Sequence, residues 1–246
     1  MSADDARAAA GAEAIAELDA VTRRLRRECH WDRAQDERSI VPHTVEEAYE
    51  LADAAAAGDD AKLLDELGDV LFQVHFLALL LEERDAGDLA AVAAHTTAKL
   101  IRRHPHVFGE VEVAGTDDVR SNWDRIKREQ EGRGEEGPFA DVPENLPGLL
   151  YARKLQRRAA AAGLPGPAED REEALERLDA ALATVRSAPS SADPELASPD
   201  ERAAAEEVIG RLLLAVVDVA RIARVDPELS LRQVADGLRE VADGAG

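Results

Sequence analysis

The segment DELGDVLFQVHFLALLL, residues 65–81, has three acidic residues in its first five positions and continues as a nearly unbroken apolar run. Coiled into a helix, this run is apolar on almost every side, which is typical of a helix buried inside a domain. Glu66 and Asp69 therefore start on or beside a core helix, where acidic side chains are rarely found without a partner. The segment predicts both a helical core and a specific use for its acids.

A second acidic group, EEAYE at residues 46–50, precedes the first in another helical pattern. Glu47 and Glu50 are spaced i,i+3, as are Glu66 and Asp69, so each pair lies on one helix face. Two such helices packed antiparallel would direct these carboxylates to one point, where their repulsion is costly unless a cation joins them. Oxygen ligands without cysteine or paired histidine suit Mg²⁺, with Mn²⁺ as a substitute. A run of acids is otherwise usually a solvated face.

The composition narrows the class of protein. The chain has 246 residues, of which 45% are hydrophobic and 3% aromatic, so its core is mainly Ala, Leu and Val, which together with many Glu and Arg favour helix. A net charge of −21 argues against stable binding to nucleic acid. Cys29 is the single cysteine, which excludes an internal disulfide or thiolate metal site. Without a secretory leader or an apolar run long enough for a bilayer, we expect a cytoplasmic location and no membrane.

Helical patterns and their breakers predict an all-α chain of two domains. We expect a loop over residues 29–43, with Pro42 closing it and Thr44 as an N-cap. A stretch crowded with Gly and Pro, residues 132–147, is the predicted linker between domains 1–131 and 148–246. The predicted helices are 12–28, 44–58, 59–84, 88–103, 117–130, 149–162, 171–185, 200–223 and 229–242.

The second predicted domain resembles the first in two short segments. Residues 46–54 (EEAYELADA) resemble 172–180 (EEALERLDA), and 68–72 (GDVLF) resemble 210–214 (GRLLL). Ala- and Glu-rich helices look alike by chance, but the shared glycine register favours a decayed duplication. In this register Val208 replaces Glu66 and Arg211 replaces Asp69, so a Mg²⁺ site of the first kind could not survive. The second domain is therefore predicted to be degenerate and structural.

Five motifs now identify a resemblance. They are WD at residues 31–32 with Gln35, TVEEAYE at 44–50, DELGDVLFQV at 65–74, RRHPHVF at 102–108 and WDRIK at 123–127. In this order they resemble MazG-type nucleoside triphosphate pyrophosphohydrolases, of the all-α NTP pyrophosphatase superfamily, over about residues 18–129. The whole chain resembles a MazG protein of tandem helical-bundle domains. One departure is His30, where the family commonly has proline.

The resemblance implies Mg²⁺-dependent hydrolysis of an NTP or dNTP to the monophosphate and pyrophosphate, in a homodimer. The acidic ligands carry over to Glu47, Glu50, Glu66 and Asp69. The remaining site residues that it implies bind substrate: Trp31, Lys99, Arg103, Trp123 and Lys127.

Elementary chemistry is compatible with these roles. Lys99 and Arg103 lie i,i+4 on one helix face and could clamp phosphates, although alone they read as surface charge. Trp123 could stack on a base or serve as a core anchor. Glu46 or one of the four acidic ligands could accept the proton from water, and the sequence does not choose between them.

Two rival readings remain open. Helical bundles with inward carboxylates also hold di-iron centres, but these use Glu-x-x-His pairs, whereas the second acidic group here ends in Asp69. Alternatively, the chain is a non-catalytic helical interaction protein whose acids are solvated.

Overall fold

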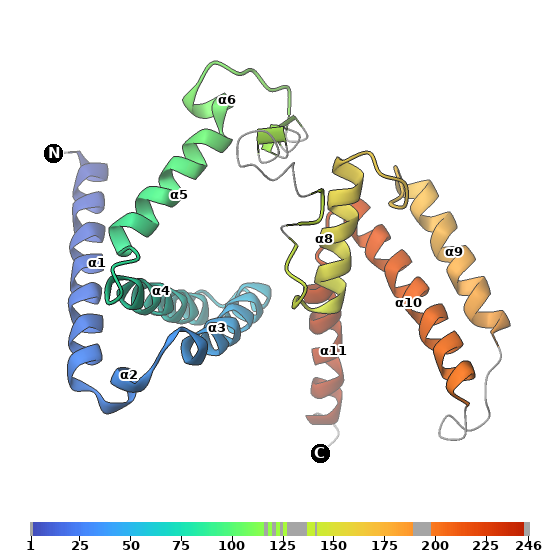
Figure 1. Cartoon of the computed structure of the whole chain (residues 1–246), viewed down its shortest axis with the longest axis horizontal. Helices are drawn as coiled ribbons and strands as arrows, with labels where there is room; N and C mark the ends of the chain where they lie inside the picture. Colours follow the sequence, from blue (N-terminus) through green and yellow to red (C-terminus); the bar gives the residue numbers. More distant parts are fainter. Residues whose placement is uncertain are drawn as a thin grey trace. The chain divides into compact units, whose positions relative to one another are not determined.

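The computed structural model describes residues 2–115, 118, 119, 122, 123, 125, 126, 137–140, 142–188 and 198–243. Within these residues every regular element is a helix, which confirms the predicted all-α class (Figure 1). The chain divides into two compact units, Met1–Arg102 and Arg103–Gly246. No helix of the described part is long and apolar enough to cross a bilayer.

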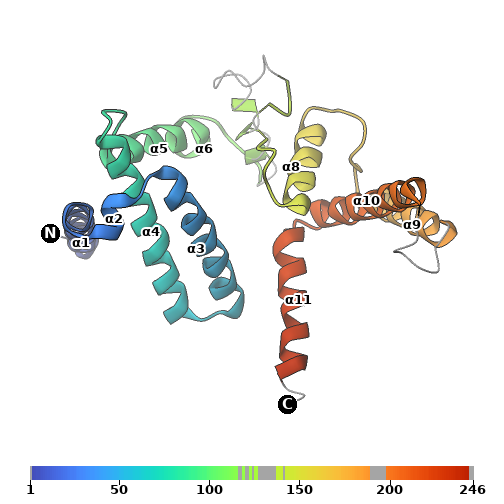
Figure 2. The same ribbon diagram turned by 60° about the horizontal axis from the view of Figure 1, so that its bottom comes forward.

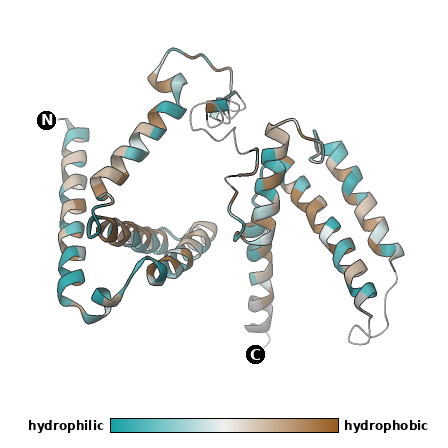
Figure 3. Cartoon of the chain, in the orientation of Figure 1, coloured by the Kyte–Doolittle hydropathy of each residue, from teal (hydrophilic) through white to brown (hydrophobic). Residues whose placement is uncertain are grey.

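The first unit is built around an antiparallel helix pair. Helix α3 packs along α4, and α1 packs on another side of α4 (Figures 1 and 2). Hydrophobic residues are concentrated along α4 (Figure 3), as its sequence predicts for a central helix. The elements of this unit are α1 (Ala3–Glu28), α2 (His30–Ala34), α3 (Glu37–Ala57), α4 (Asp60–Glu82) and α5 (Leu89–Arg103), whose last residue falls in the second unit.

A small apolar cluster holds α3 against α4. Ile40 of α3 and Phe76 and Leu80 of α4 are almost fully buried, and Phe72 and Leu77 pack against them. At the other side of α4, the buried His75 lies with its Nδ1 4.0 Å from the Asp19 carboxylate of α1. His75 is thus a core residue, as the apolar pattern around it indicates.

Helix α3 begins seven residues before its predicted start. Asp36 is its N-cap, in a capping box with Ser39, whereas Thr44 lies inside the helix and donates from its hydroxyl to the Ile40 carbonyl. Pro42 also lies inside α3. The prediction was wrong because proline removes only one backbone hydrogen bond, and burial of Ile40 (1% exposed) offsets that loss. The predicted loop before it contains α2.

The second unit contains a further antiparallel pair. Helix α10 packs on α9 and on α8, and α11 contacts α8 and α10. Its elements are α6 (Pro105–Phe108), α8 (Gly148–Ala161), α9 (Arg171–Ser187), α10 (Pro199–Ile222) and α11 (Pro227–Asp243), and the last four lie within about two residues of the predicted helices.

The predicted linker and the helix before it fall partly on residues that are not described. Residues 132–136 and 141 of the linker, and most of the predicted helix 117–130, lie outside the described part. The division between compact units falls earlier, after Arg102. The linker at 132–147 therefore stays a prediction.

Candidate metal centre

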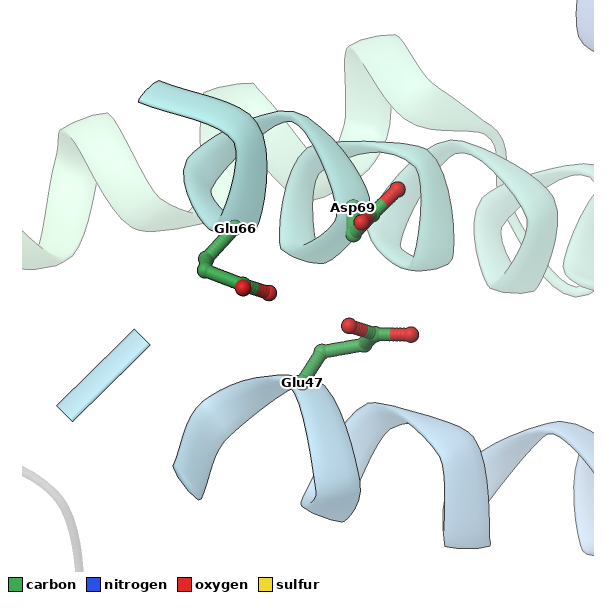
Figure 4. A group of neighbouring side chains, drawn as sticks. All are labelled: Glu47, Glu66 and Asp69. Atoms are coloured by element: carbon green, nitrogen blue, oxygen red, sulfur yellow. The ribbon is translucent and has the colours of Figure 1, made fainter. Parts of the chain in front are cut away.

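Three of the four predicted metal ligands meet between α3 and α4. Carboxylate oxygens of Glu47, Glu66 and Asp69 all lie within 4.8 Å of one another. Glu47 projects from α3 towards α4, which supplies the other two residues (Figure 4). We call these three residues the acidic trio.

Helix periodicity explains why the trio and the apolar cluster share one interface. Ile40 stands two turns before Glu47 on α3, and Phe76 stands two turns after Asp69 on α4. Packing of Ile40 on Phe76 therefore fixes the register in which Glu47 meets Asp69. The short connection between α3 and α4 also favours this register. Gly58 adopts the left-handed conformation (φ 67°) that ends α3 just before α4 begins.

Burial and the repulsion between like charges disfavour the ionised forms of Glu66 and Glu47. Glu66 is 5% exposed, and burial raises its pKa above the usual value, with further increases from the charge of Glu50, a hydrogen bond to Glu50 and the charge of Glu47. Burial also raises the pKa of Glu47, followed by the charges of Asp69, Glu50 and Glu46. These carboxyl groups therefore resist being ionised together unless positive charge joins them.

The described part of the chain supplies little of that charge. Within the described residues no Lys or Arg forms an ion pair with a trio carboxylate, and Lys62 acts on Glu66 only through the longer-range field. Elsewhere the buried Asp218 is paired with Arg221 at 2.7 Å. An oxygen-only donor set that lacks an internal counter-ion fits a hard divalent cation such as Mg²⁺.

Glu50 and Glu46 border the trio on α3. Glu50 is exposed and interacts with Glu66, but it is not one of the three converging residues. The exposed Glu46 lies beside His43, whose Nδ1 is 3.7 Å from its carboxylate. Trp31 of α2 is 51% exposed and meets the His43 ring edge-on, with 6.0 Å between ring centroids.

Sequence reasoning missed His43 and Lys62. His43 lies three and four residues before Glu46 and Glu47, and it lowers the pKa of Glu47. Lys62 lies one turn before Glu66 and lowers its pKa. The i,i+3 and i,i+4 spacing to the acids was the signal that could have found both residues.

The remaining predicted residues lie on other elements, in the second unit or outside the described residues. Lys99 is half-buried on α5, and no described hydrogen bond or ion pair links it to the trio. Arg103 ends α5 one turn later, in the second unit. Trp123, also there, meets His104 edge-on at 4.9 Å, and its buried Nε1 has no hydrogen-bond partner. Lys127 lies outside the described residues.

The region that holds the acidic trio is similar to known proteins. Residues 35–108 match the MazG nucleotide pyrophosphohydrolase domain. The nucleoside triphosphate pyrophosphohydrolase of Escherichia coli strain K12 is 35% identical over 210 residues, which cover 83% of this chain and 75% of that protein. The chain belongs to the MazG family. This assignment confirms the resemblance seen in the sequence, together with the enzyme class that it implies.

Two further proteins named for the same activity are similar to this chain. The nucleoside triphosphate pyrophosphohydrolase/pyrophosphatase MazG of Thermotoga maritima is 34% identical over 205 residues, covering 83% of this chain and 74% of its own. The nucleoside triphosphate pyrophosphohydrolase of Mycolicibacterium smegmatis is 32% identical over 156 residues, covering 62% and 48%. The MazG domain match contains the trio, Glu50, Lys99 and Arg103, and it ends before Trp123.

Proposed function

We propose that this MazG protein hydrolyses nucleoside and deoxynucleoside triphosphates between the α and β phosphates, releasing the monophosphate and pyrophosphate. The observation that carries the proposal is the acidic trio inside the MazG domain match, which brings the buried Glu66 together with Glu47 and Asp69 and has no ion-paired Lys or Arg among the described residues. The names of the relatives support the reaction class.

We assign Mg²⁺, with Mn²⁺ as a substitute, to the acidic trio, and Glu50 beside it as a fourth ligand. When bound, the ion neutralises charge on the phosphates and lowers the pKa of a bound water. Glu66 and Asp69 are held by the core helix α4, so they keep the ion site rigid while Glu47 and Glu50 approach from α3. Glu46 is exposed and can accept a proton from water, as can Glu50.

The base and ribose of the substrate need a stacking surface, and its phosphates need positively charged side chains. Trp31 presents a half-exposed aromatic face beside His43, which suits stacking on a base or ribose. We propose phosphate contacts for Lys99, Arg103 and Lys127 and a stacking contact for Trp123, as the family resemblance implies. Lys62, next to Glu66 along α4, adds positive charge near the site.

We further propose a homodimer that uses the outer face of α4. The surface stripe Leu64, Leu67, Leu71 and Val74 is 36–74% exposed and follows a 3-4-3 spacing on the side of α4 roughly opposite Glu66 and Asp69. Burying such a stripe against a second copy gains about 25 cal/mol per Å². The same stripe recurs on α10 as Ile209, Leu213 and Val216, which the repeat aligns with Leu67, Leu71 and Val74.

We infer a cytoplasmic role in nucleotide metabolism without stable nucleic-acid binding, in keeping with the net charge of −21. Removal of non-standard nucleotides and control of normal pools both use this chemistry, and a ranking of substrates separates them.

The test is turnover of a triphosphate panel by Glu66→Gln and Asp69→Asn, which remove charge with little change of shape. We expect each to lose at least about a hundredfold in kcat while far-UV circular dichroism stays helical. Glu173→Ala, at the position that matches Glu47 in the second repeat, is the matched control and should stay within about twofold, because its half has lost the other acidic pair. Full activity in Asp69→Asn would support the non-catalytic reading of the acids.

A further inference from the structure

The second unit contains a cavity of about 320 Å³ between α9 and α10. Its wall joins apolar residues, among them Leu214 and several alanines, to two arginines, one from each helix. The residues that matter most to its chemistry are Gln156, Arg177, Arg211, Leu214 and Asp218.

The internal repeat aligns the two helices that line this cavity with the two helices that carry the acidic trio. Helices α9 and α10 pack as a pair, as α3 and α4 do in the first unit. The repeat register places Arg211 where the first half has Asp69 and Val208 where it has Glu66. A carboxylate reaches a phosphate through a metal ion, whereas a guanidinium contacts phosphate oxygens directly. The substitution therefore exchanges a metal ligand for a direct anion ligand.

Both arginines retain capacity for an anion. Arg177 donates to the Gly166 carbonyl and to Glu173, and Arg211 donates to Glu207 at 2.6 Å, so N–H donors remain on each five-donor guanidinium. The side chains of Arg211 and Glu207 are 70% and 63% exposed, so their ion pair contributes little and yields readily. Arg221 already neutralises Asp218, which therefore opposes an anion only weakly.

Gln156 presents an unpaired hydrogen-bond acceptor beside the apolar wall of the cavity. Its Nε2 donates to the Leu214 carbonyl at 2.9 Å, while its Oε1 is buried without a hydrogen-bond partner. The residue is only 9% exposed, so this acceptor is costly to leave unpaired. A ligand N–H would satisfy the Gln156 Oε1, and a flat ring would fit the apolar wall. A nucleobase with an amino group provides the N–H and the ring together.

We propose that the cavity binds a nucleoside monophosphate, with the phosphate on Arg177 and Arg211 and an N–H of the base on Gln156. A cavity of about 320 Å³ is of the size that holds small-molecule ligands. The ligand would be a product of the first half only if the proposed function holds; the binding itself does not depend on it. The degenerate half thus becomes a nucleotide-sensing site that needs no metal.

The experiment is calorimetric titration of AMP, ribose 5-phosphate and inorganic phosphate into the full chain in EDTA. We expect AMP to bind more tightly than the other two. Arg211→Ala should weaken AMP at least about tenfold, because an anion loses a charge-assisted hydrogen bond. Arg202→Ala, on an exposed part of the same helix, is the matched control and should leave the affinity unchanged. Gln156→Leu should weaken AMP but not inorganic phosphate.

Three results would overturn the proposal: no binding of AMP in EDTA, equal affinity in Arg211→Ala and Arg202→Ala, or inorganic phosphate binding as tightly as AMP. Asp69→Asn separates the two sites, because it should abolish the proposed turnover and leave AMP binding intact. Loss of AMP binding in that variant would place the nucleotide in the first half and also contradict the proposal.

Discussion

Glu66 is buried on the core helix beside Glu47 and Asp69, and Glu50 adds a further negative charge. The pKa values of Glu66 and Glu47 are both raised, chiefly by burial. In the absence of metal, the folded state therefore holds these protons to higher pH than the unfolded chain does. Above the usual carboxyl range their ionisation lowers stability, and a bound cation reverses this by favouring the ionised forms.

This linkage predicts a pH-dependent response to metal. As the pH falls from neutral towards the ordinary pKa of a glutamate, about 4.3, protons compete with Mg²⁺ for Glu66 and Glu47, whose pKa values are raised, so the metal affinity should fall. Melting temperatures with and without Mg²⁺ across this range should converge at the acidic end. In Glu66→Gln the difference should be small at every pH. A metal-induced shift in Tm that is independent of pH in the wild type would contradict the assignment.

Individual site residues differ in how far sequence alone could place them. Glu47, Glu66 and Asp69 could be predicted because helix periodicity fixes which residues share a face, and the structure brings these three together. The contact between Trp31 and His43 could not, because it joins α2 to α3 through a turn whose direction is set by packing. The roles of Lys99, Arg103, Trp123 and Lys127 stay predictions.

Helix α3 shows that an element's bounds depend on tertiary packing. Proline and a good N-cap residue favour a start at Thr44, yet the helix starts at Glu37 and continues through Pro42. The additional turns place Ile40 against Phe76 and Leu80. Sequence pattern located the acidic face of α3 correctly because that face lies beyond the proline, whereas the preceding turns depend on a partner helix.

The same contact gives a prediction for stability. Ile40→Ala removes a side chain that is 1% exposed and should lower the free energy of unfolding by about 2–5 kcal/mol. Because Ile40 also fixes the register of Glu47, its loss should weaken Mg²⁺ binding as well. Val41→Ala is the control, since Val41 is 48% exposed and its loss should cost about 0.5 kcal/mol or less. Urea unfolding measures both; equal midpoints would mean that Ile40 does not anchor α3.

At the scale of the whole molecule, each unit contains a packed helix pair, α3 with α4 in the first and α9 with α10 in the second. The helical nature of both, and the positions of α8 to α11, could be predicted from periodicity and from the Gly and Pro breakers. The division after Arg102 could not, because it falls inside α5, whose helical pattern continues across it. Both helices of the proposed repeat, α4 and α10, carry the apolar stripe, whereas Glu66 and Asp69 of α4 are replaced by Val208 and Arg211 on α10.

Assembly through α4 predicts a change of mass. Leu67→Glu combined with Leu71→Glu places two charges in the proposed interface and should convert a dimer to a monomer in sedimentation equilibrium. Ala61→Glu, which lies outside the stripe on the same helix, should leave the mass unchanged. A wild-type protein that is monomeric at micromolar concentration, or a double variant that remains dimeric, would exclude this interface.

In the proposed function, the acidic trio directs hydrolysis between the α and β phosphates. The most direct measurement is product analysis of the purified protein with a panel of NTPs and dNTPs, with and without Mg²⁺. We expect nucleoside monophosphate and pyrophosphate in equal amounts, only with metal, and neither from Asp69→Asn. Release of orthophosphate with a diphosphate, or equal turnover in EDTA, would contradict it.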